Sequence, residues 1–180
     1  MKKEPIYGGA KYYEDEHVAY GSKVTAYFYA DDKIAEGEPF GDDEDTRYVD
    51  DMGSEWQKGH MLAKSLGGDN KVHNMLPMKT SVNNSTFKTV ENYVRKLIEY
   101  LPDIQKEVGA GTLHIEYTVE RVSENPIRVK GYKFPSKFSY SIKILKEDGT
   151  MVNSFALLIV LSLLEIAPEI KLSDTLSVDE

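Results

Sequence analysis

The sequence contains no cysteine, and this absence removes several kinds of chemistry at once. The chain forms no disulfide, has no thiol nucleophile and holds no zinc through cysteine, so any metal must bind to nitrogen or oxygen atoms. Long apolar runs are also missing. The longest, residues 155–164, is interrupted by Ser162 and is far shorter than the roughly 20 residues that cross a bilayer. We therefore expect this run to form a buried strand or helix, and we expect no membrane partner.

No signal peptide is predicted at the start of the chain, because residues 1–5 carry charged side chains and no apolar segment follows them. We expect a protein that works in the cytoplasm, or one that is delivered as an effector by a specialised secretion system. The length of 180 residues, with 41% apolar and 29% charged residues, predicts a single globular domain over residues 1–180.

Positive charge is scarce overall, and the net charge of −8 argues against a nucleic-acid partner. Its distribution reverses that argument. Residues 31–51 contain ten acids and two bases, which account for the whole net charge, whereas residues 56–106 contain eight bases and four acids. The acidic segment also contains Gly37, Pro39 and Gly41, which predict a solvated loop. Its charge has three open interpretations: a plain exposed loop, a shield over the active face, or a docking site for a basic inhibitor.

The hydrophobic pattern predicts an α+β fold, an antiparallel β-sheet with one prominent central helix. Apolar residues recur at intervals of three and four from Asn84 onward, which predicts a helix that Pro102 ends and that Asn83 or Asn84 caps. A second pattern, alternation of apolar and polar residues, predicts strands at 113–120 and 138–145.

Three further local predictions concern turns and faces. Residues 18–30 are rich in β-formers and are expected to form strand, with a hairpin turn at Gly21-Ser22. Asp148-Gly149 predicts a second hairpin turn, leading into a strand at 151–160. Alternation in strand 113–120 directs His114 to the polar side of the sheet.

Residues 56–95 carry the side chains that a phosphodiester hydrolase needs: a base, a site for a cation, and donors that hold the phosphate. His60 is the candidate base, since its pKa is near neutral. Gly59 before it would let a phosphate approach closely, and Lys58 is a candidate phosphate contact. Taken alone, a histidine of this kind is more often structural or simply exposed.

The remaining candidates follow His60 in the chain. Asn83 offers an amide oxygen to a hard, largely hydrated cation such as magnesium, and Asn74 would orient the imidazole or bind the metal's water. Glu91 would accept hydrogen bonds from the same water, and Arg95, four residues later, would lie on the same helix face and reach the phosphate. An Asn before a helix is usually a cap, and a Glu–Arg pair is usually surface decoration. Their grouping in one basic stretch favours the functional interpretation.

The segment from Trp56 to Arg95 resembles the DNA/RNA non-specific endonucleases, also called ββα-metal or His-finger nucleases. Their signature runs Asp-Arg-Gly-His, Asn-x-x-Pro, a magnesium-binding Asn, then Glu-x-x-x-Arg. The resemblance implies a ββα-metal core at residues 56–101, cleavage of DNA or RNA without sequence preference, and dependence on magnesium, with manganese as a substitute. In the order of the signature, the implied site residues are the general base His60, the upstream asparagine Asn74, the metal ligand Asn83, the water-binding Glu91 and the phosphate-contacting Arg95.

The sequence departs from this signature at Gln57 and Lys58, which stand in place of Asp and Arg, and at Met78, where a polar residue is common. Lys58 keeps the charge but loses the bidentate geometry of arginine. Arg47 is a weak counterpart of the family's other upstream arginine. These departures leave open the alternative of a non-catalytic module that binds nucleic acid or protein.

The form of residues 59–68 is most similar to the branch of this family found as bacterial toxin domains. The resemblance implies an effector nuclease with a cognate immunity or inhibitor protein as its partner. The remaining histidines receive no catalytic role. His73 is expected to be structural or exposed, on the opposite face of its strand from Asn74, and His17 shows no partner.

Overall fold

The structure is a computed structural model, and it describes residues 9–13, 20–30, 32–41, 46–109, 111–122, 125–152 and 173–177 of the chain. Its main sheet has five strands in the order β1-β2-β5-β8-β9, with every neighbouring pair antiparallel. The α+β class with an antiparallel sheet is confirmed. These strands are β1 (Gly9–Tyr13), β2 (Lys23–Tyr29), β5 (Leu113–Val122), β8 (Lys137–Lys146) and β9 (Ser173–Ser177).

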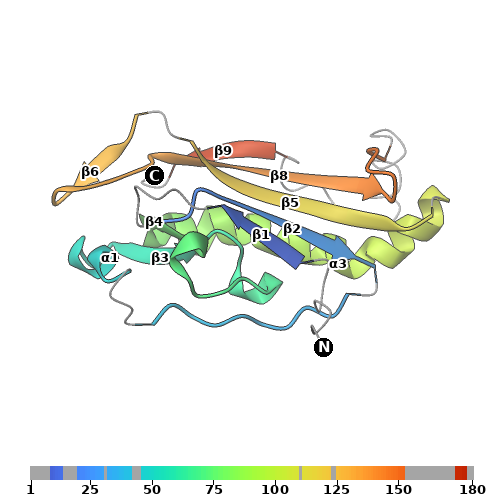
Figure 1. The fold of residues 1–180 in the computed structure, drawn as a ribbon, viewed down its shortest axis with the longest axis horizontal. Coiled ribbons are helices and arrows are strands. Elements are labelled where there is room, and N and C mark those ends of the chain that lie inside the picture. Colours follow the sequence, from blue (N-terminus) through green and yellow to red (C-terminus); the bar gives the residue numbers. More distant parts are fainter. Residues whose placement is uncertain are drawn as a thin grey trace.

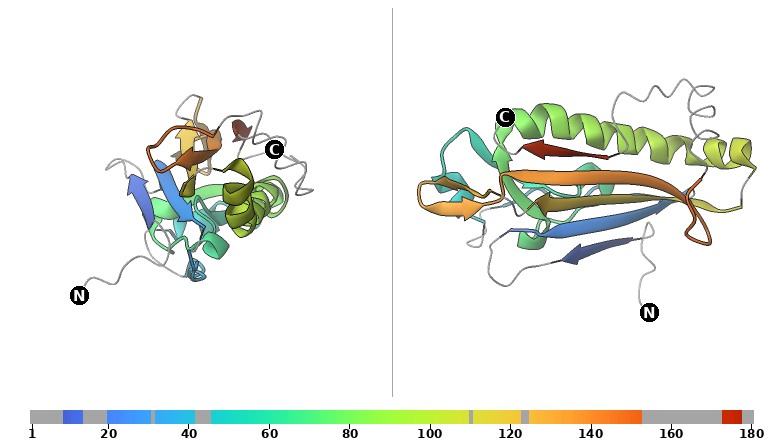
Figure 2. Two further views of the ribbon diagram at one scale, coloured as in Figure 1. Left: turned by 90° about the vertical axis from the view of Figure 1, so that its right-hand side faces the viewer. Right: turned by 90° about the horizontal axis from the view of Figure 1, so that it is seen from above.

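The long helix α3 (Lys88–Val108) runs lengthwise along one face of this sheet (Figure 2). The core lies between the two, because the apolar positions of β5 and β8 point to the helix and its apolar stripe points back. The fully buried residues that line this interface include Val94, Leu97, Leu101, Ile115, Tyr117 and Phe138. The predicted central helix and the two predicted strands are confirmed.

The sequence predicted that the helix ends at Pro102. This is wrong, because the helix continues to Val108. An interior proline costs about 3 kcal/mol, whereas burying one large aliphatic side chain contributes about 1.5–3 kcal/mol. Beyond Pro102, Ile104 is fully buried and Val108 packs against the core, so these contacts offset the lost hydrogen bond. Gly109 ends the helix in the left-handed conformation at φ 64°, donating its N–H to the Lys106 carbonyl.

The start of the helix also differs from the prediction. Helical backbone begins at α2 (Thr80–Val82) and passes through one π-helical turn, η3 (Asn83–Phe87), before α3. Asn83 and Asn84 therefore lie inside the helical segment and cap nothing, and the N-cap of α2 is Lys79. Within this segment the hydroxyl groups of Ser85 and Thr89 donate to the carbonyl groups four residues earlier. Single π-turns of this kind are frequent at functional sites.

A second, two-stranded sheet precedes the helix. Strand β3 (Trp56–His60) pairs antiparallel with β4 (Met75–Lys79), with His60 opposite Met75. The loop between them contains two 3₁₀ turns, η1 (Lys64–Leu66) and η2 (Val72–Asn74). His73 and Asn74 were predicted to lie on a strand, but they lie in the second of these turns. Strand, strand and helix follow one another here in the ββα order (Figure 1).

The predicted hairpin turn at Gly21-Ser22 is wrong. Strand β2 begins after these residues and pairs with β1, so the connection between the two strands spans residues 14–22. Gly21 instead packs on η2: its N–H donates to the Met75 carbonyl at 2.7 Å, and a Cβ atom there would lie 2.3 Å from the His73 carbonyl oxygen. Glycine is needed for this close approach of two backbones.

His114 lies on the predicted face of β5 but is not exposed there. Its side chain is only 8% exposed, because the rings of Tyr27 and Tyr29 on β2 cover it, with centroids 6.3 and 5.2 Å from the imidazole. The turn at Asp148-Gly149 is confirmed by the hydrogen bond from the Gly149 N–H to the Lys146 carbonyl. The predictions for residues 153–160, for the run 155–164 and for His17 lie outside the described residues.

The acidic segment is a loop over residues 32–41, as predicted, but it ends in a helical turn, α1 (Tyr48–Asp51). Val49 anchors this turn because it is fully buried. A small hairpin of β6 (Ile127–Val129) and β7 (Tyr132–Phe134) completes the described elements. Within the described part of the chain, no helix combines the length and the apolar character that a membrane crossing requires.

Candidate functional site

The candidate site lies where β3 ends beside the start of the helix. His60 is the last residue of β3, Asn83 is the first residue of the π-turn, and Glu91 lies in the first turn of α3. All three line one cavity of about 230 Å³. The structure therefore brings together the predicted base, the predicted metal ligand and the predicted carboxylate.

The imidazole of His60 is held from one side by residues 38–40. Its Nε2 atom lies 3.1 Å from the Glu38 carbonyl oxygen, and the Phe40 ring packs against it with centroids 4.2 Å apart. Since a carbonyl group only accepts, Nε2 carries the hydrogen, and Nδ1 of the neutral ring is the proton acceptor. Burial lowers the pKa of His60, while the contact with the Glu38 carbonyl acts in the opposite direction. A lowered pKa keeps the base neutral at physiological pH.

Gly59 does not have the role that the sequence suggested. It is buried, and a Cβ atom at this position would lie 2.5 Å from the terminal methyl of Met78 on β4. Met78 is itself fully buried. Glycine at 59 thus makes room for Met78 rather than for a phosphate, and this packing accounts for an apolar residue at position 78.

Glu91 is poised between its two protonation states, because burial raises its pKa to about 7 and the charge of Lys88 lowers it less. Behind it lies Tyr117 of β5, whose pKa is raised by burial and secondly by the charge of Glu91. A cation in the cavity would favour the ionised carboxylate. Among the described residues, no group of three or more His, Cys, Asp or Glu side chains could hold a metal. The oxygen donors at the cavity are an amide, Asn83, and one carboxylate, which suits a metal that keeps much of its water.

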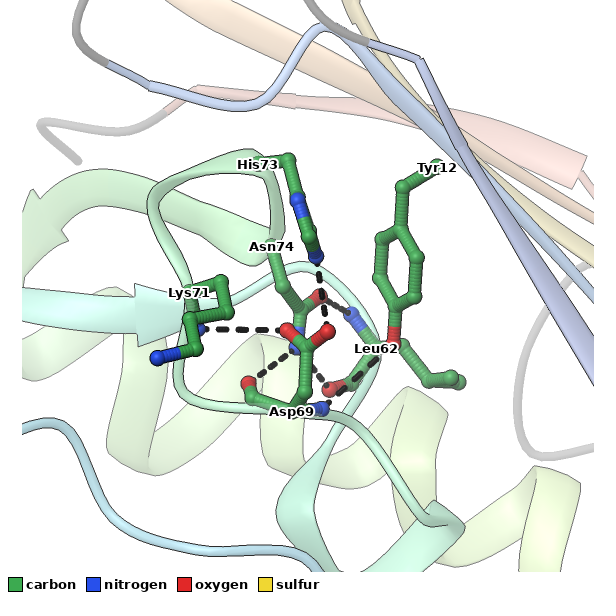
Figure 3. A network of polar contacts seen from close by, with 6 residues as sticks. All are labelled: Tyr12, Leu62, Asp69, Lys71, His73 and Asn74. Atoms are coloured by element: carbon green, nitrogen blue, oxygen red, sulfur yellow. Dashed lines mark hydrogen bonds and ion pairs between the residues drawn. The ribbon is translucent and has the colours of Figure 1, made fainter.

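Asn74 does not contact the imidazole, so its predicted direct role is corrected. Its side chain is fully buried, and both ends of the amide bind backbone (Figure 3). The oxygen accepts from the Leu62 N–H at 2.7 Å, and the nitrogen donates to the carbonyl groups of Leu62 and Asp69 at 3.0 and 2.8 Å. Asn74 thus fixes the backbone two residues after His60.

His73 belongs to the same network and is structural, as predicted. Its Nε2 lies 2.7 Å from an Asp69 carboxylate oxygen, and its ring packs on Tyr12 at a centroid distance of 4.4 Å (Figure 3). The other carboxylate oxygen of Asp69 accepts from the Lys71 N–H. These contacts tie β1 to the loop that carries the site.

Arg95 is one turn beyond Glu91 on α3, and the structure places it at a neighbouring cavity of about 650 Å³. This cavity shares Ser65 with the cavity of His60, so the two adjoin. Arg95 is exposed, and its charge contributes to lowering the pKa of Glu36. The predicted phosphate contact thus lies beside the cavity of His60, Asn83 and Glu91 and not within it.

The sequence matches the family of DNA/RNA non-specific endonucleases over residues 12–108. This chain belongs to that family. The matched region contains β3, β4 and the whole of α3, so it covers the ββα unit and every candidate site residue. No curated protein matches the sequence.

Solved structures of nucleases have a similar fold to this endonuclease-family chain. One is the EndoG/EndoGI complex, described as showing the mechanism of EndoG inhibition, with a TM-score of 0.52 and 17% identity over 81% of this chain and 69% of that chain. Another is the Sda1 nuclease with bound zinc ion, with a TM-score of 0.47 and 13% identity over 79% and 70% of the two chains. The likeness to the EndoG structure, together with the order β3, β4 and helix, confirms the predicted ββα-metal fold.

Lys58 stands where the endonuclease signature has arginine, two residues before His60 on β3. Its Nζ atom lies 2.9 Å from an Asp50 carboxylate oxygen and 3.1 Å from the Gly41 carbonyl oxygen. The side chain lines a third cavity of about 510 Å³, which His60 also lines. Its charge is already paired, which the sequence did not indicate.

Lys64 is the residue that sequence reasoning missed. It lines both the cavity of Asn83 and Glu91 and the cavity of Lys58, and among the described residues His60 is the only other one that both cavities share. Its Nζ atom lies 2.8 Å from a Glu36 carboxylate oxygen. The sequence does place Lys64 four residues after His60 within the basic stretch. The family signature does not include this position, so the signature alone does not point to Lys64.

Proposed function

We propose that this endonuclease-family chain is a divalent-metal-dependent nuclease that hydrolyses phosphodiester bonds of DNA, RNA or both without sequence preference. The observation that carries the proposal is the single cavity lined by His60, Asn83 and Glu91. These three side chains come from three elements, β3, η3 and α3, and neither core packing nor helix capping requires them to meet there.

In the proposed mechanism, Nδ1 of His60 takes a proton from a water molecule, which then attacks phosphorus in line with the leaving oxygen. The Glu38 carbonyl holds the ring by accepting from Nε2–H, so the base needs no reorientation before the reaction. Arg95, from the adjoining cavity, and Lys58 would neutralise phosphate charge.

The donor set fits a hard cation such as magnesium, with manganese as a substitute. The Asn83 amide oxygen would hold the ion, and the Glu91 carboxylate would accept hydrogen bonds from its water. When bound, the ion supplies positive charge to the scissile phosphate and to the leaving oxygen. Glu91 has to be ionised for this task, and the cation itself favours that state.

A plasmid degradation assay tests the proposal. Supercoiled DNA and a structured RNA are each incubated with the purified chain in magnesium, in manganese and after addition of a chelator. Cleavage that the chelator stops, and that His60→Ala abolishes while the far-UV spectrum stays unchanged, is the expected result. A fully active His60→Ala variant would overturn the mechanism.

The second candidate is a binding module that holds nucleic acid or a protein partner without cutting. It is favoured by one observation, namely that the Lys58 charge is paired with Asp50. The same assay separates the two proposals. Absence of cleavage with every divalent metal, together with retained binding to the same DNA, would favour the module.

We further propose that the chain acts as a bacterial toxin or effector with a cognate inhibitor, a proposal that rests on the resemblance of residues 59–68 to toxin domains. Expression inside bacterial cells should then stop growth, and expression of His60→Ala should not. Normal growth at equal expression of the unaltered chain would contradict the toxin role without affecting the nuclease proposal.

A further inference from the structure

An extended segment, residues 36–41, crosses the face of the site and is called the strap below. It belongs to the blue trace of residues 32–41, which passes below β3 in the view of Figure 1. Two of its residues, Glu38 and Phe40, contact the imidazole of His60. A third, Gly37, donates its N–H to the Lys64 carbonyl at 2.8 Å, and a Cβ atom at Gly37 would lie 1.8 Å from the Gly68 carbonyl oxygen. The backbone of the strap is therefore fixed against the site.

Both lysines beside His60 hold a carboxylate from this acidic part of the chain. Glu36 of the strap pairs with Lys64 at 2.8 Å, and Asp50 of α1 pairs with Lys58 at 2.9 Å. The Glu36 charge also interacts with Arg95. Lys64 has the larger effect in lowering the pKa of Glu36, and Arg95 lowers it further. Every cation assigned to substrate phosphate, and Lys64 in addition, thus interacts with an internal acid.

The two partners of each pair differ in exposure. The side chains of Glu36 and Asp50 are 65% and 57% exposed, whereas those of Lys64 and Lys58 are 40% and 10% exposed. In each pair the acid is thus the more exposed partner and has the freer access to solvent. Exposed ion pairs of this kind are weak, so a rotation of the acid side chain is enough to release the lysine.

A phosphate oxygen makes the same charge-assisted hydrogen bond to an ammonium group as a carboxylate oxygen does. Lys58, Lys64 and His60 line one cavity, and Lys64 extends from it into the cavity of Asn83 and Glu91. The lysine ammonium groups are thus arranged along the two cavities that meet at the catalytic histidine.

We propose that Lys58 and Lys64 form two subsites for backbone phosphates of the nucleic acid next to the scissile one, and that Asp50 and Glu36 occupy these subsites as internal competitors. This inference rests on the proposed nuclease function. On substrate binding the two acid side chains turn to solvent, while the strap backbone stays and continues to orient His60 through the Glu38 carbonyl. The acidity of residues 36–50 thereby sets the affinity for substrate.

The test measures binding of a fluorescein-labelled DNA duplex, and of RNA of the same sequence, by fluorescence anisotropy in a chelated buffer. Chelation prevents cleavage and leaves His60 and the strap unaltered. The variants Glu36→Gln and Asp50→Asn are each expected to lower Kd by about two- to fivefold. The slope of log K against log salt should change little in these two variants, because each lysine also contacts a phosphate in the complex of the unaltered chain.

Matched controls remove the same charges elsewhere. Glu107→Gln and Asp103→Asn alter exposed residues of α3 that lie beyond the site, toward the far end of the helix. Lys64→Gln and Lys58→Gln should weaken binding and make the salt dependence shallower. Thermal melts verify that every variant is folded.

The inference is overturned if Glu36→Gln and Asp50→Asn bind no more tightly than their matched controls, or if Lys64→Gln and Lys58→Gln leave the salt dependence unchanged. It is also overturned if no variant binds nucleic acid. Cleavage of plasmid by the unaltered chain in magnesium is recorded separately, so failure of the nuclease proposal is distinguished from failure of the subsites.

Discussion

Two asparagines of the signature occupy opposite kinds of environment. Asn74 is fully buried and gives both ends of its amide to backbone, whereas Asn83 lines the open cavity beside His60 and Glu91. The amide of Asn74 is thus taken up by the backbone, whereas the amide of Asn83 is open to a ligand. Replacing each by alanine should therefore produce different losses.

Asn74→Ala leaves the buried Leu62 N–H and two carbonyl groups without partners, at a cost of about 1–3 kcal/mol. We expect a lower Tm, a reduced kcat through misplacement of His60, and an unchanged magnesium requirement. Asn83→Ala should leave the Tm within about 2 °C and raise the magnesium concentration needed for half-maximal activity. Thermal melts and magnesium titrations measure both effects. A Tm loss confined to Asn83→Ala would contradict these assignments.

The pH dependence of cleavage follows from the environment of His60. Its pKa is lowered below the ordinary histidine value of 6.5, with burial as the main cause. A general base acts only when it is unprotonated, so kcat/KM should rise with pH through a midpoint below 6.5 and then become level. Rates on a short duplex at saturating magnesium and constant ionic strength provide the profile. A midpoint clearly above 6.5 would exclude His60 as the base in its present environment.

At the scale of elements, the helical segment from Thr80 to Val108 organises the site. Its first part carries Asn83 and Glu91 on both sides of the junction between the π-turn and α3, and its second part holds the sheet. The apolar period predicted this helix because its stripe is continuous over several turns. Neither end of the helix was predicted correctly. At the C-terminal end, the cost of Pro102 is outweighed by packing that the sequence does not show.

The interior proline of α3 leads to a stability prediction. Pro102 is exposed and removes one backbone donor, so Pro102→Ala restores a helical hydrogen bond without disturbing the core. We expect the free energy of unfolding to rise by about 1–3 kcal/mol. Urea denaturation followed by circular dichroism measures it, with Asp103→Ala as the neighbouring control. A loss of stability would show that the helix needs the proline geometry at this point.

The parts of the site that the sequence did not predict share one physical cause, which is that their contacts join distant segments. The spacing of residues 56–95 located His60, Asn83 and Glu91, because one hairpin and one helix bring them together. The strap contact to His60 spans 22 positions and depends on backbone atoms of Glu38, which no side-chain pattern reveals. Burial of Asn74 and the role of Lys64 likewise depend on how the loop between β3 and β4 closes.

At the scale of the whole molecule, the charge distribution opposes substrate approach and then favours binding. The net charge of −8 repels a polyanion at long range, and the basic stretch around the site attracts it at short range. Salt screens the long-range repulsion first, because the Debye length falls from about 30 Å at 0.01 M to about 10 Å at 0.1 M. Contacts at the site are screened only at higher salt.

This balance predicts that kcat/KM for a long DNA rises with salt from about 0.01 M, passes through a maximum near about 0.1 M, and then falls. A variant in which Asp42, Asp43 and Asp45 are replaced by Asn and Glu44 by Gln loses four negative charges from the acidic segment. In its salt profile the rise of kcat/KM at low salt should disappear, while the fall at high salt remains. Initial rates over a salt series on both proteins measure this. A steady fall of kcat/KM with salt in the unaltered chain would mean that the surplus of acids does not act on the substrate at long range.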